Sequence, residues 1–145
     1  MDKTKKSIEY FEKGFACSQS VFAPWAEGPP LDKETALKIA SSFGGGMGGM
    51  GGVCGAVTGA FMVLGLHFGR TEAGQTEIRE KNYALVKEFA RRFREKHGSL
   101  ECNQLLGVDI STPEGYDSVH ANREYFEKCL SFVRSASEIL EDLIV

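Results

Sequence analysis

The 145-residue sequence has four cysteines, but no two of them are close enough to form a Cys-x-x-Cys pair. Thioredoxin-type redox sites and the common zinc knuckles depend on such local pairs, so the sequence argues against both. The Cys-x-x-Cys-His motif that attaches a c-type haem is absent as well. Any site that uses several of these cysteines must therefore be assembled by tertiary packing.

The sequence also lacks a strong excess of one charge and a long apolar run. Seventeen basic and twenty acidic residues give a formal net charge of −3, which argues against nucleic acid as a partner. The main apolar run, residues 53–68, is shorter than the roughly 20 residues that a membrane span requires. The charged N-terminal segment has no apolar signal-peptide core, so we expect a cytoplasmic protein.

Length and composition indicate a single four-cysteine helical domain over residues 1–145. The hydrophobic fraction of 42% and the charged fraction of 26% are those of an ordinary globular protein. Apolar residues recur at helical spacing, as at Ile8, Phe11 and Phe15, and no comparable segment alternates as a strand would. We predict an all-α fold with little or no sheet, a compact bundle of five to seven helices around a central Gly/Ala-rich apolar helix.

Prolines, glycines and capping residues indicate where the helices begin and end. Pro24 is expected to end the second helix, while Asp32 and Ser99 are expected to cap the third and sixth. Residues 107–119 are expected to be a loop with a brief helical start at Thr112. The predicted helices cover residues 3–13, 15–23, 33–43, 53–68, 76–96, 99–106 and 121–140.

Three of the four cysteines lie at predicted helix starts. Free amide N–H groups and the helix dipole favour the thiolate form at Cys17, Cys54 and Cys102. Cys129 lies in the middle of the last predicted helix and would be a resolving or structural partner. The alternative is that all four cysteines are small buried hydrophobic residues, as most free cysteines are.

Nine of the seventeen glycines fall between Gly44 and Gly59. A helix rather than a strand precedes these glycines, so they match a dinucleotide-binding site only weakly. No Gly-Lys-Ser/Thr follows them, which excludes a P-loop. We expect this segment to bring bare backbone and its N–H groups close to the Cys54 sulfur, with Gly52, Gly55 and Gly59 binding any cofactor. The alternative is a flexible turn.

The glycines at positions 51, 55 and 59 are spaced four apart and leave one ridge of the central helix bare. Another helix can approach closely along such a ridge. A partner protein or a second copy of this chain, forming a homodimer, is one candidate for that helix. His67, His97 and His120 stand alone in the sequence, and we expect core or solvated side chains there rather than ligands or bases.

The cysteines and their neighbours resemble a known family. They occur in the segments FACSQSV at Cys17, GVCGAVTG at Cys54 and CNQLLG at Cys102, followed by Cys129 and its helix. Over about residues 8–139 they are similar to the redox-active proteins named for their C, GCAxxG, C, C pattern. The resemblance implies a small helical redox protein related to the N-terminal domain of split-Soret cytochromes c, where an iron–sulfur cluster has been proposed.

These observations leave three functions open. The first is thiol/disulfide exchange or electron transfer with an unidentified redox partner, in which Cys54 is the nucleophile, Cys102 or Cys17 its partner, and Cys129 a further member. Such a protein would be an oxidoreductase if it acts as an enzyme. The second is a metal site in which all four thiolates hold an iron–sulfur cluster or zinc. The third is a structural or interaction module with inert cysteines.

Overall fold

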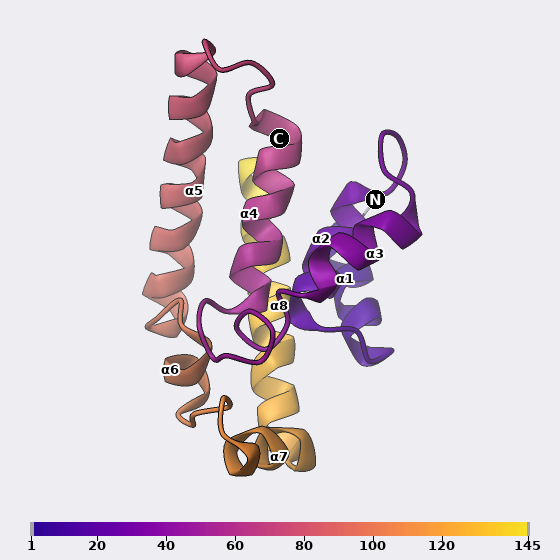
Figure 1. The fold of residues 1–145 in the computed structure, drawn as a ribbon, viewed down its shortest axis with the longest axis vertical. Coiled ribbons are helices and arrows are strands. Elements are labelled where there is room, and N and C mark those ends of the chain that lie inside the picture. The colour runs from indigo at the N-terminus through magenta and orange to yellow at the C-terminus, as the bar shows by residue number, and fades with distance from the viewer. Residues whose placement is uncertain (1, 145) are drawn as a thin grey trace.

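The computed structural model describes residues 2–144 and consists of α-helices joined by loops (Figure 1). The helices are α1 (Lys3–Glu12), α2 (Cys17–Ala26), α3 (Lys33–Ser41), α4 (Gly55–Phe68), α5 (Thr76–His97), α6 (Cys102–Leu106), α7 (Pro113–Ala121) and α8 (Arg123–Leu143). Within residues 2–144 there is no β-sheet, only an isolated antiparallel bridge between Val53 and Glu101. The predicted all-α fold is confirmed, and the additional helix is α7. No helix among these residues combines the length and the apolar character that crossing a bilayer requires.

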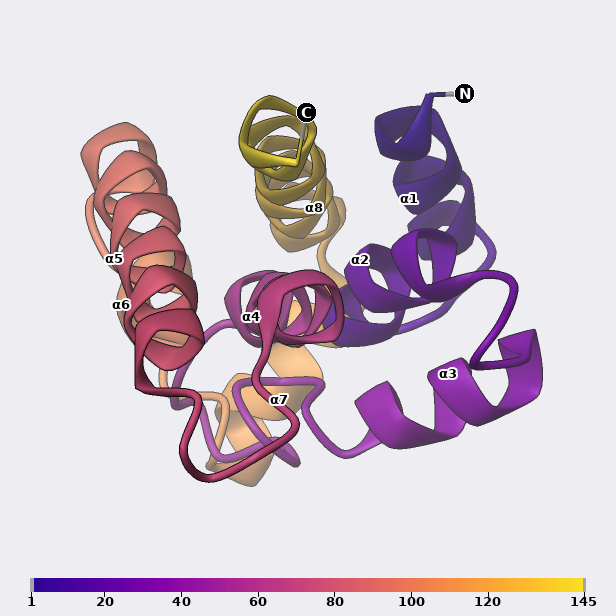
Figure 2. The same ribbon diagram turned by 90° about the horizontal axis from the view of Figure 1, so that it is seen from above.

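Helix α4 is the centre of the bundle. Viewed from above, it lies between α5, α8 and α2 (Figure 2), and it packs against all three. It is apolar on nearly every side, so it has no face suited to water, and Val57, Val63 and Leu64 are completely buried. Phe89 and Phe93 of α5 complete this core from one side. The expected central Gly/Ala-rich apolar helix is confirmed.

The bare ridge of α4 is covered by α2 of the same chain. A Cβ atom at Gly59 would lie 2.8 Å from the carbonyl oxygen of Ser18, and one at Gly55 would lie 2.9 Å from the Ser18 nitrogen. The Ser18 hydroxyl in turn donates a 2.7 Å hydrogen bond to the Ala40 carbonyl, which links α2 to α3. The predicted close approach of a helix along this ridge is confirmed at Gly55 and Gly59, and the helix is α2 of the same chain rather than one from a partner or a second copy.

The glycine segment before α4 forms a hydrogen-bonded left-handed turn. Positive φ angles run through consecutive residues, at Gly45, Gly46, Met47, Gly48 and Gly49. Backbone bonds of 3.1 Å from Gly51 to Gly45 and 2.8 Å from Gly52 to Gly46 close the turn. Since side chains disfavour this backbone region, the turn requires a sequence rich in glycine.

Several helix boundaries differ from the prediction by two or three residues, and α6 begins at Cys102 after Glu101 rather than at the expected Ser99 cap. Helix α2 continues past Pro24 to Ala26, because a proline in the last turn removes only one late hydrogen bond and its ring is buried in the core. Residues expected to be mostly loop form α7, which begins with Thr112 accepting a 3.0 Å hydrogen bond from the Gly115 nitrogen. The Thr-Pro-Glu start was visible in the sequence, but too few apolar residues follow it at helical spacing.

The contact between α2 and α4 predicts how two glycine substitutions on α4 change stability, one inside the contact and one outside it as a control. Gly59→Ala should lower the free energy of unfolding by about 1–3 kcal/mol, because its Cβ meets the Ser18 backbone. Gly65→Ala meets nothing within 4 Å, and should be neutral or stabilising by up to about 1 kcal/mol. Urea unfolding of both variants checks this. Equal effects at the two positions would contradict the packing described here.

Candidate functional site

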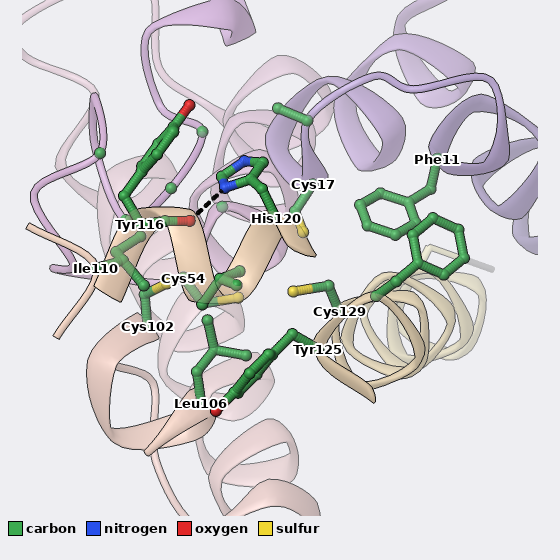
Figure 3. A pocket seen from close by; sticks show the side chains of 18 of the residues that line it. Phe11, Cys17, Cys54, Cys102, Leu106, Ile110, Tyr116, His120, Tyr125 and Cys129 are labelled. Carbon is green, nitrogen blue, oxygen red and sulfur yellow. Dashed lines mark hydrogen bonds between the residues drawn. The ribbon is translucent and has the colours of Figure 1, made fainter. Parts of the chain in front are cut away.

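All four cysteines line one cavity of about 890 Å³ (Figure 3). Cys17 is the first residue of α2, Cys54 caps α4, Cys102 is the first residue of α6, and Cys129 lies within α8. The structure thus brings together four thiols that are far apart in the sequence and come from four helices. Within residues 2–144 all four cysteines are free thiols.

A short β-bridge holds Cys54 and Cys102 on the same wall of the cavity. Val53 pairs with Glu101, and the Cys102 nitrogen donates a 2.6 Å hydrogen bond to the Gly52 carbonyl. Because side chains alternate along extended backbone, Cys54 and Cys102 share the face opposite Val53 and are diagonal neighbours across the bridge. Both side chains are buried. The bridge ties the end of the glycine segment to the start of α6.

Cys17 and Cys129 form the second pair, across the contact between α2 and α8. The side chains of Cys17 and Cys129 point into the same part of the cavity, close enough for the two thiols to affect one another's ionisation (Figure 3). The interaction with the Cys17 thiol, with a further contribution from the positive charge of Lys128, holds the pKa of Cys129 below its usual value despite burial. The same interaction, burial and the nearness of the other three sulfurs raise the pKa of Cys17 well above its usual value.

Burial controls the other two thiols. It raises the pKa of Cys54 to about 12, although hydrogen bonds from the backbone of Ala56 and Val57 act in the opposite direction. Burial likewise raises the pKa of Cys102 to about 12, helped by the charges of Cys129 and Glu101. The predicted helix starts are present, but the expected thiolates at these positions are not. The thiol with the lowered pKa is Cys129, which the sequence analysis gave no special reactivity.

Helix α7 supplies a wall of the cavity that the sequence analysis missed. Tyr116 and His120 lie on it with their rings stacked, 4.1 Å between centroids, and the His120 Nδ1 donates a 2.8 Å hydrogen bond to the Tyr116 carbonyl (Figure 3). Tyr125 and Arg123 of α8 line the cavity beside them. Nothing in the sequence connects these residues with the cysteines, because His120 stands alone and its helix was expected to be a loop.

The predicted cofactor glycines divide into two groups. Gly55 lines the cavity, next to Cys17, where its missing side chain allows α2 to approach. Gly52 and Gly59 are not among the lining residues. Gly52 closes the left-handed turn, and Gly59 accommodates Ser18. Close packing accounts for these two glycines without a cofactor.

The positions of the four thiols can be compared with the predicted metal site, whose ligands would be Cys17, Cys54, Cys102 and Cys129. Within residues 2–144, no three His, Cys, Asp or Glu side chains converge closely enough to hold a metal ion. Zinc needs four ligands around one point, with sulfurs at about 2.3 Å, so the thiols as placed do not fit a single zinc ion. An iron–sulfur cluster is larger than one ion, and four thiols around a shared cavity match its ligand count.

Comparison with known proteins agrees with the cysteine pattern. The sequence pattern of the family described as "Putative redox-active protein (C_GCAxxG_C_C)" matches residues 15–143. A protein of Archaeoglobus fulgidus named "Uncharacterized protein" is 28% identical over 143 residues, which covers 93% of this chain and 88% of the relative. No solved structure matches the chain.

The buried thiols predict a loss of stability at alkaline pH. In the unfolded chain thiols ionise near roughly pH 8.5, whereas Cys54 and Cys102 stay protonated until about pH 12 in the folded protein. The folded state therefore binds more protons above pH 8.5, and the free energy of unfolding falls as the pH rises from there towards 12. Urea unfolding at several pH values should show a shallower fall in Cys54→Ala than in the unmodified protein. Identical slopes would show that burial does not hold the Cys54 proton.

Proposed function

The chain belongs to the C_GCAxxG_C_C family, whose name describes its members as redox-active, and from this premise we propose that it cycles between a dithiol and a disulfide at Cys17 and Cys129. The observation that carries this proposal is the placement of Cys17 of α2 and Cys129 of α8, whose side chains point into the same part of one cavity (Figure 3). The interaction between the two thiols lowers the pKa of Cys129, which makes Cys129 the better nucleophile because the thiolate is the reactive form.

The two thiols would act in sequence during thiol/disulfide exchange. The Cys129 thiolate attacks one sulfur of a disulfide substrate, the substrate's S–S bond breaks, and one half leaves as a thiolate. The sulfur of Cys17 then attacks the Cys129 sulfur in the resulting mixed disulfide. The second half of the substrate leaves with the proton of Cys17. The protein ends with a Cys17–Cys129 disulfide, and the substrate has gained two electrons as two thiols.

This assignment differs from the roles expected from the sequence. Cys54 was the expected nucleophile, but burial keeps its thiol protonated at neutral pH. Cys102 shares that property. In the proposed cycle both remain neutral thiols in the wall of the cavity, and the short bridge at Val53 holds them in place.

A second candidate is an iron–sulfur cluster, favoured by the one cavity that all four thiols share. Cys17, Cys54, Cys102 and Cys129 would be its ligands, and the cluster would supply one-electron transfer when bound. This candidate requires all four thiols to lose their protons, which is costly for Cys54 and Cys102 as they are buried here. If the protein held such a cluster, its redox cycle would not include a disulfide between its own cysteines.

Peptide mapping after mild oxidation separates the two candidates. Anaerobically purified protein treated with diamide should lose two of its four thiols and yield a linked Cys17–Cys129 peptide. Cys129→Ser should abolish the link, whereas the matched control Cys54→Ser should retain it. A Cys54–Cys102 link, or four free thiols after oxidation, would contradict the dithiol proposal. Visible absorbance with bound iron that disappears in Cys54→Ser would favour the cluster.

A further inference from the structure

We propose that the disulfide reduced at this site is a small organic molecule with an aromatic or apolar body and a negative charge, rather than a disulfide of another protein. This inference rests on the proposed dithiol function and specifies its substrate. It is carried by three properties of the cavity beside Cys17 and Cys129: its size, its aromatic lining and the sign of the charges around it.

The size of the cavity suits a small molecule. Its volume of about 890 Å³ lies within the roughly 300–1,000 Å³ of small-molecule sites. Cys17 and Cys129 face this space and are partly buried, while α7 forms one wall (Figure 3). A disulfide within a folded protein would have to enter the cavity together with its flanking chain. A small disulfide can enter the cavity whole.

The lining is largely aromatic and aliphatic. The rings of Phe11 and Phe126 lie 5.0 Å apart between centroids, and Leu106 and Ile110 add apolar surface on the opposite side (Figure 3). Tyr116 stacks on His120 and still leaves 47% of its surface exposed, so part of its ring is accessible from solvent. These contacts favour a flat or apolar body attached to the reacting sulfurs.

The charges around the cavity favour an anion. Apart from the thiols and tyrosines, the ionisable side chains among the described lining residues are His120 and Arg123, and no carboxylate is among them. The guanidinium of Arg123 lies over the Phe126 ring, 4.4 Å from its centroid, and donates to Glu127, which is outside the lining. In a chain with a net charge of −3, a cavity wall without carboxylates is a local departure from the overall charge.

The start of α8 also borders the cavity. Its cap, Asn122, lines the cavity but makes no side-chain capping bond to the first turn. The side-chain amide of Asn122 instead donates a 2.7 Å hydrogen bond to the Ser118 carbonyl of α7. The first turn of this 21-residue helix has no capping side chain and holds the acidic Glu124 next to Arg123, so Arg123 is the positive group that this end of the helix brings to the cavity wall.

The test measures how fast the fully reduced protein reacts with three disulfides. These are dithiobis(nitrobenzoate), which is aromatic and anionic, dithiodipyridine, which is aromatic and neutral, and insulin, which presents protein disulfides. Each rate is divided by the rate of the same reagent with N-acetylcysteine, which removes intrinsic reactivity. We expect the normalised rate to be highest for the anionic aromatic reagent and lowest for insulin.

Two arginine variants on α8 test whether a positive charge causes the preference for the anionic reagent. Arg123→Gln should lower the anionic-to-neutral ratio by roughly two- to fivefold, the effect of removing one exposed positive charge. Arg134→Gln is the matched control, since Arg134 is exposed on the same helix and does not line the cavity; its ratio should not change.

Two outcomes would overturn the inference and are distinguishable from each other. If insulin reacts as fast as the aromatic reagents, or if both arginine variants leave the ratio unchanged, the substrate class is wrong although the Cys17–Cys129 couple stands. If mapping finds no Cys17–Cys129 link with any of the three reagents, the proposed function fails and this inference fails with it.

Discussion

The close contact between α2 and α4 is the constraint on which the site depends. Gly55 and Gly59 let the backbone of Ser18 approach α4, at distances that a side chain on either glycine would prevent. Cys17 directly precedes Ser18, so the same contact carries Cys17 to the cavity wall beside Cys54. The small residues of the family motif are therefore explained first by helix packing, and the position of the thiols is a consequence of that packing.

Two opposing effects determine the pKa values of the four thiols in this cavity. A helix start favours the thiolate, whereas removal from water favours the neutral thiol. At Cys54 burial outweighs the backbone hydrogen bonds, and the pKa rises to about 12. At Cys129 the interaction with the Cys17 thiol outweighs burial, and the pKa falls. This difference in pKa between the thiols is why we propose Cys17 and Cys129, rather than Cys54 and Cys102, as the reactive pair.

Much of the fold was predictable because it depends on local signals. Asp32 caps α3 as expected, accepting a 2.7 Å hydrogen bond from the Thr35 nitrogen, and the helix periodicity located α4 and α5 closely. The helix-start positions of Cys54 and Cys102 were also predictable. Their pKa values were not, because burial depends on which helices pack together. The bridge at Val53 and the wall made by α7 are tertiary features with no repeated pattern in the sequence, so neither Tyr116 nor His120 could be assigned to the site in advance.

The central claim is that Cys17 stabilises a thiolate at Cys129. Ultraviolet titration of thiolate absorbance in the reduced protein tests it most directly, with Cys17→Ala as the comparison and Cys102→Ala as the control. We expect one thiol that ionises below the ordinary range in the unmodified protein, no such thiol in Cys17→Ala, and the same low titration in Cys102→Ala. A titration that Cys17→Ala leaves unchanged would show that Cys17 does not stabilise the Cys129 thiolate.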